Sequence, residues 1–289
     1  MEKSRVMILF EKMGMERISW SLRRLHVPIP SSDLVLEVGS GGNPYFRSNV
    51  LLDAYLDTRE RHHVPLIADR KTVIAPVENL PFKDKSFDFI IASHVLEHSP
   101  DPEKFLAELQ RVGKAGYIEV PDALMERLNP YIDHRLEIYA VDNKLFIKKK
   151  KQSIPDLELQ KFYEPRAKAL IAGYLIPKFP FNFHVRFYWN DQIDHKILNP
   201  EINAGWVSSE DYPTHTKKPS AAEAIKRLIL KIARFFLSQN HRNKNINLID
   251  LLRCPRCKND KVVNHLGSIK CERCNAVYEV IDGLPHLKA

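Results

Sequence analysis

Alternating apolar and polar blocks predict a parallel α/β sheet in the first half of the chain. Short continuous apolar runs suit strands that are buried on both faces. Such runs occupy residues 34–38, 50–53, 87–92 and 117–120. Between the last two, Pro102 begins a segment with the apolar spacing of a helix. This alternation predicts a doubly wound, mostly parallel, Rossmann-like sheet.

Two amphipathic segments lie outside this core. Residues 4–26 predict one helix, ended by Pro28. Residues 220–239 predict a basic amphipathic helix that opens with a Ser-x-x-Glu capping box. Such a helix packs on its own protein or lies on a membrane surface, and we favour packing. The polar residues 241–247 resemble a linker.

The middle of the chain carries a predicted hairpin and an aromatic block. Asp142-Asn143 between apolar alternations predicts a two-residue turn, and the lysines at 148–151 are expected to be solvated. Residues 152–215 are rich in aromatic residues, which could wall a substrate pocket or cover the core. As a block they are the expected source of substrate specificity, because the sheet itself is a general platform.

A glycine-rich turn follows the first predicted strand. Gly39, Gly41 and Gly42 allow a tight turn and a close approach of the backbone to a ligand. At the end of the second strand, Asp53 could accept hydrogen bonds from ribose hydroxyls, or it could simply cap a turn. Together these features favour a nucleotide-type cofactor site.

Charge and cysteine are both concentrated in the last quarter. Residues 217–289 hold 15 Lys and Arg against 6 Asp and Glu, a net +9, whereas the whole chain has +8. Any attraction to nucleic acid or membrane should therefore lie there, although a solvated basic face is equally plausible. No run reaches the roughly 20 apolar residues of a membrane span, and we expect a cytoplasmic protein.

The four cysteines form two Cys-x2-Cys pairs, at Cys254 and Cys257 and at Cys271 and Cys274. This spacing predicts a tetrahedral thiolate site for Zn²⁺ in a small module. Four cysteines complete the coordination shell, so the metal is expected to be structural rather than catalytic.

The ordered motifs resemble the class I S-adenosylmethionine-dependent methyltransferases. They are Val-Leu-Glu-Val-Gly-Ser-Gly, the strand-end Asp53, Glu-Asn-Leu-Pro-Phe, Ser-Phe-Asp and His-Val-Leu-Glu-His, within about residues 30–122. The resemblance is to the subgroup with Leu-Pro-Phe, Ser-Phe-Asp and Glu-His signatures. It implies that S-adenosylmethionine is the cofactor.

The resemblance also implies roles for individual residues. Asp53 would bind the ribose, and His94 would face the transferred methyl group as the candidate catalytic base. The other implied cofactor-binding residues are Glu37, Gly39, Ser40, Gly41, Gly42, Glu78, Asn79 and Ser93. Asn43 replaces the third glycine of the family, and because Asn tolerates positive φ, we expect the turn to form.

The tail resembles the small zinc-ribbon activators of tRNA, rRNA and release-factor methyltransferases. The matching residues are Leu-Leu-Arg-Cys-Pro-x-Cys, the second cysteine pair and Tyr-Glu-Val-Ile-Asp-Gly-Leu-Pro. The chain would then carry its activator in cis.

These observations predict a methyltransferase domain at 1–216, with its core at about 30–150 and a substrate-side segment at 152–215. A basic helix and linker follow at 217–246, and a zinc ribbon at 247–289. The ribbon would stabilise the catalytic domain or help to recognise the acceptor. The acceptor could be an RNA or protein factor, or a saccharide or small metabolite. The alternative is a non-catalytic binding or scaffold protein on the same fold.

Overall fold

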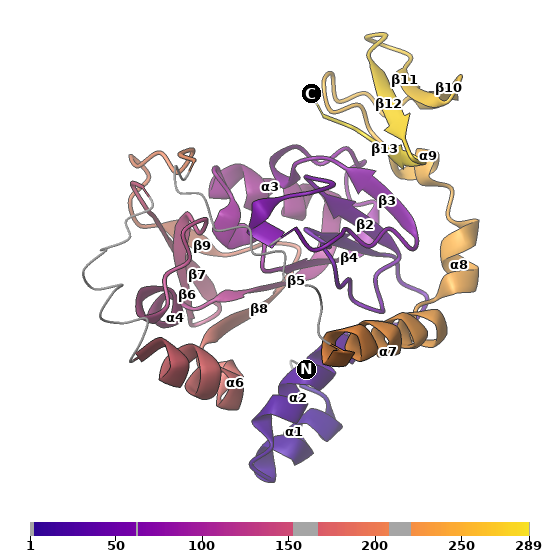
Figure 1. Cartoon of the computed structure of the whole chain (residues 1–289). Helices are drawn as coiled ribbons and strands as arrows, with labels where there is room; N and C mark the ends of the chain where they lie inside the picture. The colour runs from indigo at the N-terminus through magenta and orange to yellow at the C-terminus, as the bar shows by residue number, and fades with distance from the viewer. Residues whose placement is uncertain (1–2, 62, 153–166, 208–220, 289) are drawn as a thin grey trace. The chain divides into compact units, whose positions relative to one another are not determined.

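The computed structural model of the protein describes residues 3–61, 63–152, 167–207 and 221–288. Six strands follow the order β3-β2-β1-β4-β5-β8 in a mixed, mostly parallel sheet, as predicted (Figure 1). Their bounds are β1 Val35–Val38, β2 Val50–Asp53, β3 Lys71–Ile74, β4 Phe87–Ser93, β5 Gly113–Pro121 and β8 His184–Asn190.

The chain forms two compact units that are interleaved along the sequence. Unit 1 comprises residues 1–31, 92–110 and 115–210. Unit 2 comprises residues 32–91, 111–114 and 211–289. Each unit is described by itself.

In unit 2, β1, β2 and β3 are parallel, with Glu37 opposite Leu51 and Leu51 opposite Thr72. Every residue of β1 and β2 is buried, as expected for strands covered on both faces. The connection from β1 to β2 contains no helix, unlike that of a regular doubly wound sheet. The described part of the next connection contains only the 3₁₀ turn η2 (Arg59–Arg61). Another turn, η3 (Val77–Asn79), precedes β4.

A C-terminal segment bonds to the end of the connection from β1 to β2. Residues 241–245 of the expected linker instead belong to α8 (Asn240–Asn245), which follows α7 (Ala221–Leu237). The Asn49 amide donates to Gln239 Oε1 at 2.9 Å and to Asn243 Oδ1 at 2.8 Å. Asn49 also accepts from the N–H of Val35 at 2.9 Å, so α8 is tied to the start of β1.

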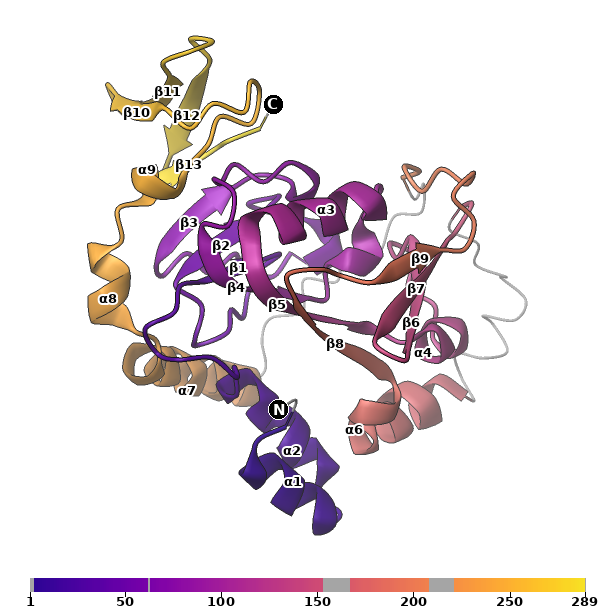
Figure 2. The ribbon, with the colours of Figure 1, turned by 180° about the vertical axis from the view of Figure 1, so that it is seen from behind.

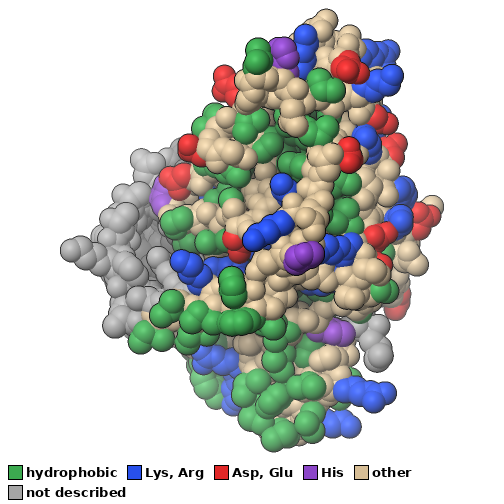
Figure 3. Space-filling view, turned by 90° about the vertical axis from the view of Figure 1, so that its right-hand side faces the viewer, with side chains coloured by type: hydrophobic (Ala, Val, Ile, Leu, Met, Phe, Trp, Pro, Cys, Tyr) green, Lys and Arg blue, Asp and Glu red, His purple; other side chains and the backbone are tan. Residues whose placement is uncertain are grey.

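The apolar residues of α7 are exposed, although we expected them to pack on the protein. Figure 3 shows green hydrophobic side chains exposed on the face of the molecule that it draws. Phe235 and Phe236 are 70% and 75% exposed. The other exposed apolar residues of α7 are Ile225, Leu228, Ile229, Ile232 and Leu237. Ser220 of the predicted capping box lies outside the described residues. No helix in the described part of the chain could span a membrane.

The cysteine module forms a four-stranded antiparallel sheet in the order β10-β11-β12-β13. Its elements are α9 Leu248–Leu251, β10 Val262–His265, β11 Ser268–Cys271, β12 Val277–Ile281 and β13 Leu284–Pro285. Asn275 and Asp282 adopt positive φ at two of its turns. The module is therefore a folded β ribbon, as its cysteine spacing predicts.

The end of the ribbon bonds to the edge strand β3 of unit 2 (Figure 2). His286 forms a parallel bridge with Ile74, and the N–H of Leu287 donates to the Ile74 carbonyl at 2.9 Å. A second seam joins Leu252 to Phe82 as an antiparallel bridge. Leu252 and Leu287 are both fully buried. The ribbon thus pairs with the end of the edge strand at Ile74.

Unit 1 begins with two helices instead of the single predicted one. They are α1 (Arg5–Lys12) and α2 (Glu16–Leu22), followed by the 3₁₀ turn η1 (Arg23–Leu25). Gly14 has φ +73° between the helices, a backbone conformation that ends a helix and that L side chains rarely adopt.

The remaining strands of unit 1 form an antiparallel pair and a small sheet. β5 pairs with β8, with Ile118 opposite Phe187. β6 (Leu136–Val141) and β7 (Lys144–Lys149) form the predicted hairpin, and β9 (His195–Ile197) joins β7. Asp142 and Asn143 both have positive φ, as a two-residue hairpin turn of this kind requires.

The helical elements of unit 1 complete its framework. They are η4 Leu96–His98, α3 Pro102–Val112, α4 Ala123–Leu128, η6 Ile171–Leu175, α6 Ile176–Lys178 and η7 Pro180–Asn182, and the last residues of α3 belong to unit 2. The lysine run is not simply solvated. Lys149 pairs with Glu103 at 3.0 Å and Lys150 with Glu126 at 2.5 Å, and their side chains are 9% and 19% exposed.

Candidate functional site

The glycine-rich turn after β1 has the backbone that its sequence predicts. Gly39 and Gly41 have φ of 64° and 55°, values that strongly favour glycine. Asn43 has no positive φ, so its tolerance of that conformation is not used. The N–H of Gly41 donates to Asp53 Oδ2 at 2.9 Å, which joins the turn to the end of β2.

One polar atom of this turn is buried and unsatisfied. Ser40 is 4% exposed, and its Oγ makes no hydrogen bond to the part of the chain that the structure describes. A buried polar group without a partner costs free energy unless a ligand or water satisfies it. Ser40 was carried over as a cofactor-binding residue, and its orphaned hydroxyl fits a polar ligand at this turn.

Glu37 has a structural role in this conformation. Its side chain is buried, and Oε2 accepts hydrogen bonds from the N–H of Tyr45 at 2.8 Å and from Ser48 Oγ at 2.6 Å. These bonds join the connection between β1 and β2 to a residue of β1. A short polar connection without a helix needs such internal partners for its backbone groups.

The segment after β2 lies across the glycine turn. The N–H of Ile67 donates to the Gly41 carbonyl at 3.0 Å. A Cβ at Gly42 would come within 2.5 Å of Val64 Cγ1, so only glycine permits this approach. The absence of a side chain at Gly42 therefore serves the approach of Val64.

Arg61 is a residue that the sequence reasoning missed. Its Nη1 lies 3.2 Å from Asp53 Oδ1, which also accepts from the N–H of Tyr55 at 3.1 Å. The Asp53 carboxylate, which was expected to bind a ribose, thus forms an ion pair with the Arg61 guanidinium. No local pattern marks Arg61, because its role depends on the fold of the segment after β2.

Of the residues expected near the adenine, Asn79 contacts the ribbon. Its Nδ2 donates to the Pro255 carbonyl at 3.3 Å, and its Oδ1 accepts from Lys258 Nζ. Glu78 lies beside it in η3. Contact of either residue with a cofactor stays a prediction.

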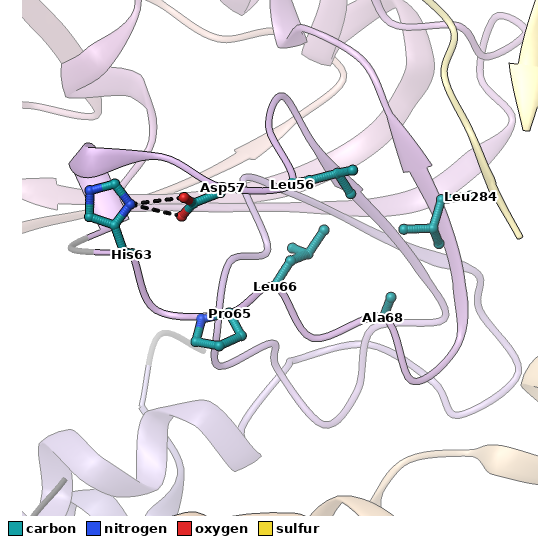
Figure 4. Close-up of a pocket in the computed structure, with 7 residues that line it drawn as sticks. All are labelled: Leu56, Asp57, His63, Pro65, Leu66, Ala68 and Leu284. Carbon is teal, nitrogen blue, oxygen red and sulfur yellow. Dashed lines mark hydrogen bonds and ion pairs between the residues drawn. The ribbon is translucent and has the colours of Figure 1, made fainter. Parts of the chain in front are cut away.

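A pocket of about 390 Å³ lies beyond the end of β2 (Figure 4). It is lined by Leu56, Asp57, His63, Pro65, Leu66, Ala68 and, from the ribbon, Leu284. His63 Nδ1 is 2.9 Å from Asp57 Oδ2, and the imidazole lowers the pKa of this carboxyl. None of the residues carried over as cofactor ligands lines this pocket.

The four cysteines converge as a tetrahedral metal site requires. Cys254 Sγ lies 3.7 Å from Cys274 Sγ, and Cys257 Sγ lies 3.5 Å from Cys271 Sγ. Thiolates bound to Zn²⁺ at about 2.3 Å are separated by about 3.8 Å, so the cluster fits this ion. Tyr278 Oη lies 3.1 Å from Cys254 Sγ, where it can donate to the thiolate and orient it.

In unit 1, His94 lies between two carboxylates directly after β4. Its Nε2 is 3.3 Å from Glu119 Oε1, and its Nδ1 is 3.4 Å from Glu97 Oε1. Burial opposes a charge on the imidazole, but its contacts with the carboxylates of Glu119 and Glu97 outweigh the burial and raise the pKa of His94 to about 9. His94 has φ +56°, a conformation uncommon for a non-glycine residue.

Glu119 gathers four partners. Arg23 Nε and Nη2 donate to its two oxygens at 2.7 and 2.8 Å, Ser93 Oγ donates at 3.1 Å, and the Tyr117 hydroxyl also donates. Burial opposes its ionisation, but the bonds to His94 and Arg23 hold the pKa of Glu119 well below its usual range. Two carried-over residues, Ser93 and His94, are therefore brought together on a buried anion.

The residues to which the family resemblance assigns a role in the site thus lie in both units. Glu37, Gly39, Ser40, Gly41, Gly42 and Asp53 meet at one turn of unit 2, Glu78 and Asn79 lie in η3 of the same unit, and Ser93 and His94 belong to unit 1. That the first group binds a cofactor stays a prediction. The last pair has the geometry of a charged polar site.

Residues 51–118 match the family described as a methyltransferase domain. The match includes Asp53, Glu78, Asn79, Ser93 and His94. The match thus covers 68 of the 289 residues.

Two curated relatives share parts of the chain. An uncharacterized protein of Methanocaldococcus jannaschii is 48% identical over 46 residues, which are 16% of this chain and 22% of that protein. An uncharacterized methyltransferase of Mycobacterium sp. (strain JLS) is 36% identical over 98 residues, 32% of this chain and 38% of that protein. The matches thus span less than two fifths of either relative.

Solved structures with similar folds are more distant. A structure of the complex that contains the Haloferax volcanii Trm112 methyltransferase activator has 16% identity and a TM-score of 0.37, with 64% of this chain and 96% of that chain covered. A SAM-dependent methyltransferase of Thermotoga maritima has 23% identity and a TM-score of 0.28, with 40% and 61% covered.

Proposed function

We propose that this protein transfers a methyl group from S-adenosylmethionine and that its ribbon binds structural Zn²⁺. The observation that carries the proposal is the methyltransferase-domain match, whose Asp53 is bonded to Gly41 of the glycine turn. The turn, the unsatisfied Ser40 Oγ and the strand-end carboxylate fit a nucleoside cofactor with a polar chain.

The cofactor supplies an activated methyl group, so the protein mainly has to align donor and acceptor. In the proposed site Asp53 binds the ribose after Arg61 has moved away from its carboxylate. Glu37, Gly39, Gly41, Gly42, Glu78 and Asn79 complete the proposed cofactor set.

His94 is the proposed residue at the acceptor. Because both ring nitrogens face carboxylates, His94 is held as a cation, and it can act as a proton acceptor only when the pH approaches its pKa of about 9. At neutral pH its role would be to orient a polar acceptor with Ser93.

The ribbon would stabilise the domain that carries the cofactor turn. Its bridges to Ile74 and Phe82 support this role, because they cover a sheet edge and bury Leu252 and Leu287. Recognition of the acceptor by the basic C-terminal quarter is the other role. Its resemblance to activators favours an RNA or protein factor as acceptor, whereas the near-neutral remainder of the chain suits a small molecule.

The test is transfer of tritiated methyl groups from S-adenosylmethionine to a fractionated lysate. We expect one fraction to be labelled by the full chain and not by Asp53→Ala. Loss of the label after nuclease treatment would identify RNA, loss after protease a protein, and resistance to both a small acceptor. Equal labelling by the two proteins would contradict the proposed site.

A further inference from the structure

A second group of metal-ligating side chains lies in unit 1, apart from the cysteines. Glu97 and His98 end η4, and His134 lies two residues before β6. One ligand atom from each residue lies within 4.8 Å of the others. The N–H of Arg135 donates to the Glu97 carbonyl at 2.7 Å, so the backbone holds the two segments together.

Both imidazoles are oriented as metal-bound histidines usually are. His98 Nδ1 lies 3.2 Å from the Asp133 carbonyl, and His134 Nδ1 lies 2.5 Å from Glu126 Oε2. A histidine ligand commonly donates one ring N–H to a carbonyl or carboxylate, which fixes the ring and directs coordination to the other nitrogen. Each ring would therefore bind an ion through Nε2.

The carboxylate of the group is buried without a hydrogen bond. Glu97 is 2% exposed, and neither of its oxygens has a hydrogen-bond partner in the described part of the chain. Oε1 of Glu97 forms an ion pair with His94, whose Nδ1 lies 3.4 Å away. A buried carboxylate is costly unless it is paired with a charge or coordinates a metal. A bound cation would supply the charge and coordinate its oxygens.

We propose that Glu97, His98 and His134 bind a divalent transition-metal ion. Two imidazoles and one carboxylate suit Zn²⁺, Mn²⁺ or Fe²⁺, and bonds of about 2.1 Å need ligand atoms roughly 3–4 Å apart, which small side-chain movements achieve here. His98 and His134 are half-buried, and three protein ligands leave positions on the ion unfilled. These positions would take water or an oxygen of a substrate.

This site differs chemically from the four-cysteine site. The thiolate cluster has a complete shell and favours soft ions, whereas three nitrogen and oxygen ligands leave the ion open. The carboxylate of Glu126 and the carbonyl of Asp133 would form the outer shell of the proposed site. Lys150 Nζ pairs with Glu126 Oε1 at 2.5 Å.

The test counts metal ions in the full chain after dialysis against Zn²⁺ or Mn²⁺. We expect two equivalents of Zn²⁺ for the unaltered protein. Glu97→Gln and His134→Ala should bind one, and Mn²⁺ affinity should fall at least about tenfold in both. His195→Ala, a histidine of the same unit outside the group, should retain two.

Glu97→Gln keeps the shape of the side chain, so it also tests whether the group is merely structural. Without metal, this variant should keep the circular-dichroism spectrum of the unaltered protein, although it loses the ion pair of Glu97 with His94. One zinc equivalent in the unaltered protein, or two in both variants, would overturn the proposal.

Discussion

At the scale of single residues, the buried carboxylate of Glu119 organises unit 1. Arg23 from η1 binds both of its oxygens, and the guanidinium also lies 3.7 Å from the Trp20 ring. Glu119 is fully buried, so each of these partners compensates a charge that has no access to water. The N-terminal helices are thereby joined to β5 and to the residue beside His94.

Removal of Arg23 should destabilise the protein strongly. Arg23→Ala leaves Glu119 buried with fewer partners, and breaking a buried pair typically costs about 3–5 kcal/mol. We expect this loss in the free energy of unfolding, measured by urea denaturation at neutral pH. The exposed Arg17→Ala in the same segment should change it by under about 0.5 kcal/mol. A loss below about 1 kcal/mol for Arg23→Ala would show that Glu119 is neutral or hydrated.

At the scale of elements, the ribbon behaves as an added edge of the sheet in unit 2. Its last residues pair with β3, and Leu252 beside its first cysteine pairs with Phe82. Arg253 strengthens the second seam, because its N–H donates to the Pro81 carbonyl at 2.9 Å and its guanidinium lies 2.6 Å from Asp84. Folding of the ribbon around a bound Zn²⁺ would therefore be coupled to the end of β3.

Removal of zinc by a chelator should loosen β3 as well as the ribbon. The Ile74 carbonyl would lose its bond from Leu287, and the edge would become exposed. We expect faster hydrogen exchange at residues 71–75, measured by mass spectrometry, with β8 in unit 1 as the internal control. Unchanged exchange at 71–75 with a fully unfolded ribbon would contradict this coupling.

Local pattern predicted the elements whose signals are local. The apolar runs gave β1, β2, β4 and β5 but not β3 and β8, and Asp142-Asn143 gave the hairpin turn. The cysteine spacing indicated the tetrahedral cluster, because each pair is a short-range feature. The break at Gly14 was missed, since apolar spacing continues across it.

Features that depend on distant pairings could not be predicted in this way. The bond of Arg23 to Glu119 spans 96 residues. Asn49 and Asn243 are polar residues in unremarkable segments, yet they join α8 to the first connection of the sheet. Arg61 and His134 carry no motif of their own, and only the fold brings them to Asp53 and Glu97.

At the scale of the whole molecule, one chain carries a stretch that matches the methyltransferase-domain family and a ribbon that pairs with the end of β3 within unit 2. The net charge of +9 is concentrated in residues 217–289, and a Zn²⁺ ion with four thiolates would reduce it by about two. The exposed apolar residues of α7 lie in the same basic stretch. The C-terminal quarter thus combines the basic charge of the chain with the exposed apolar residues of α7.

The central claim is that S-adenosylmethionine binds at the glycine turn and Asp53. Isothermal titration calorimetry measures this most directly, with Asp57→Ala as the matched control because Asp57 lines the neighbouring pocket. We predict saturable binding with one cofactor per chain, at least about tenfold weaker in Asp53→Ala and unchanged in Asp57→Ala. No binding at millimolar cofactor would favour a non-catalytic scaffold, and weakening by Asp57→Ala alone would place the cofactor in the pocket instead.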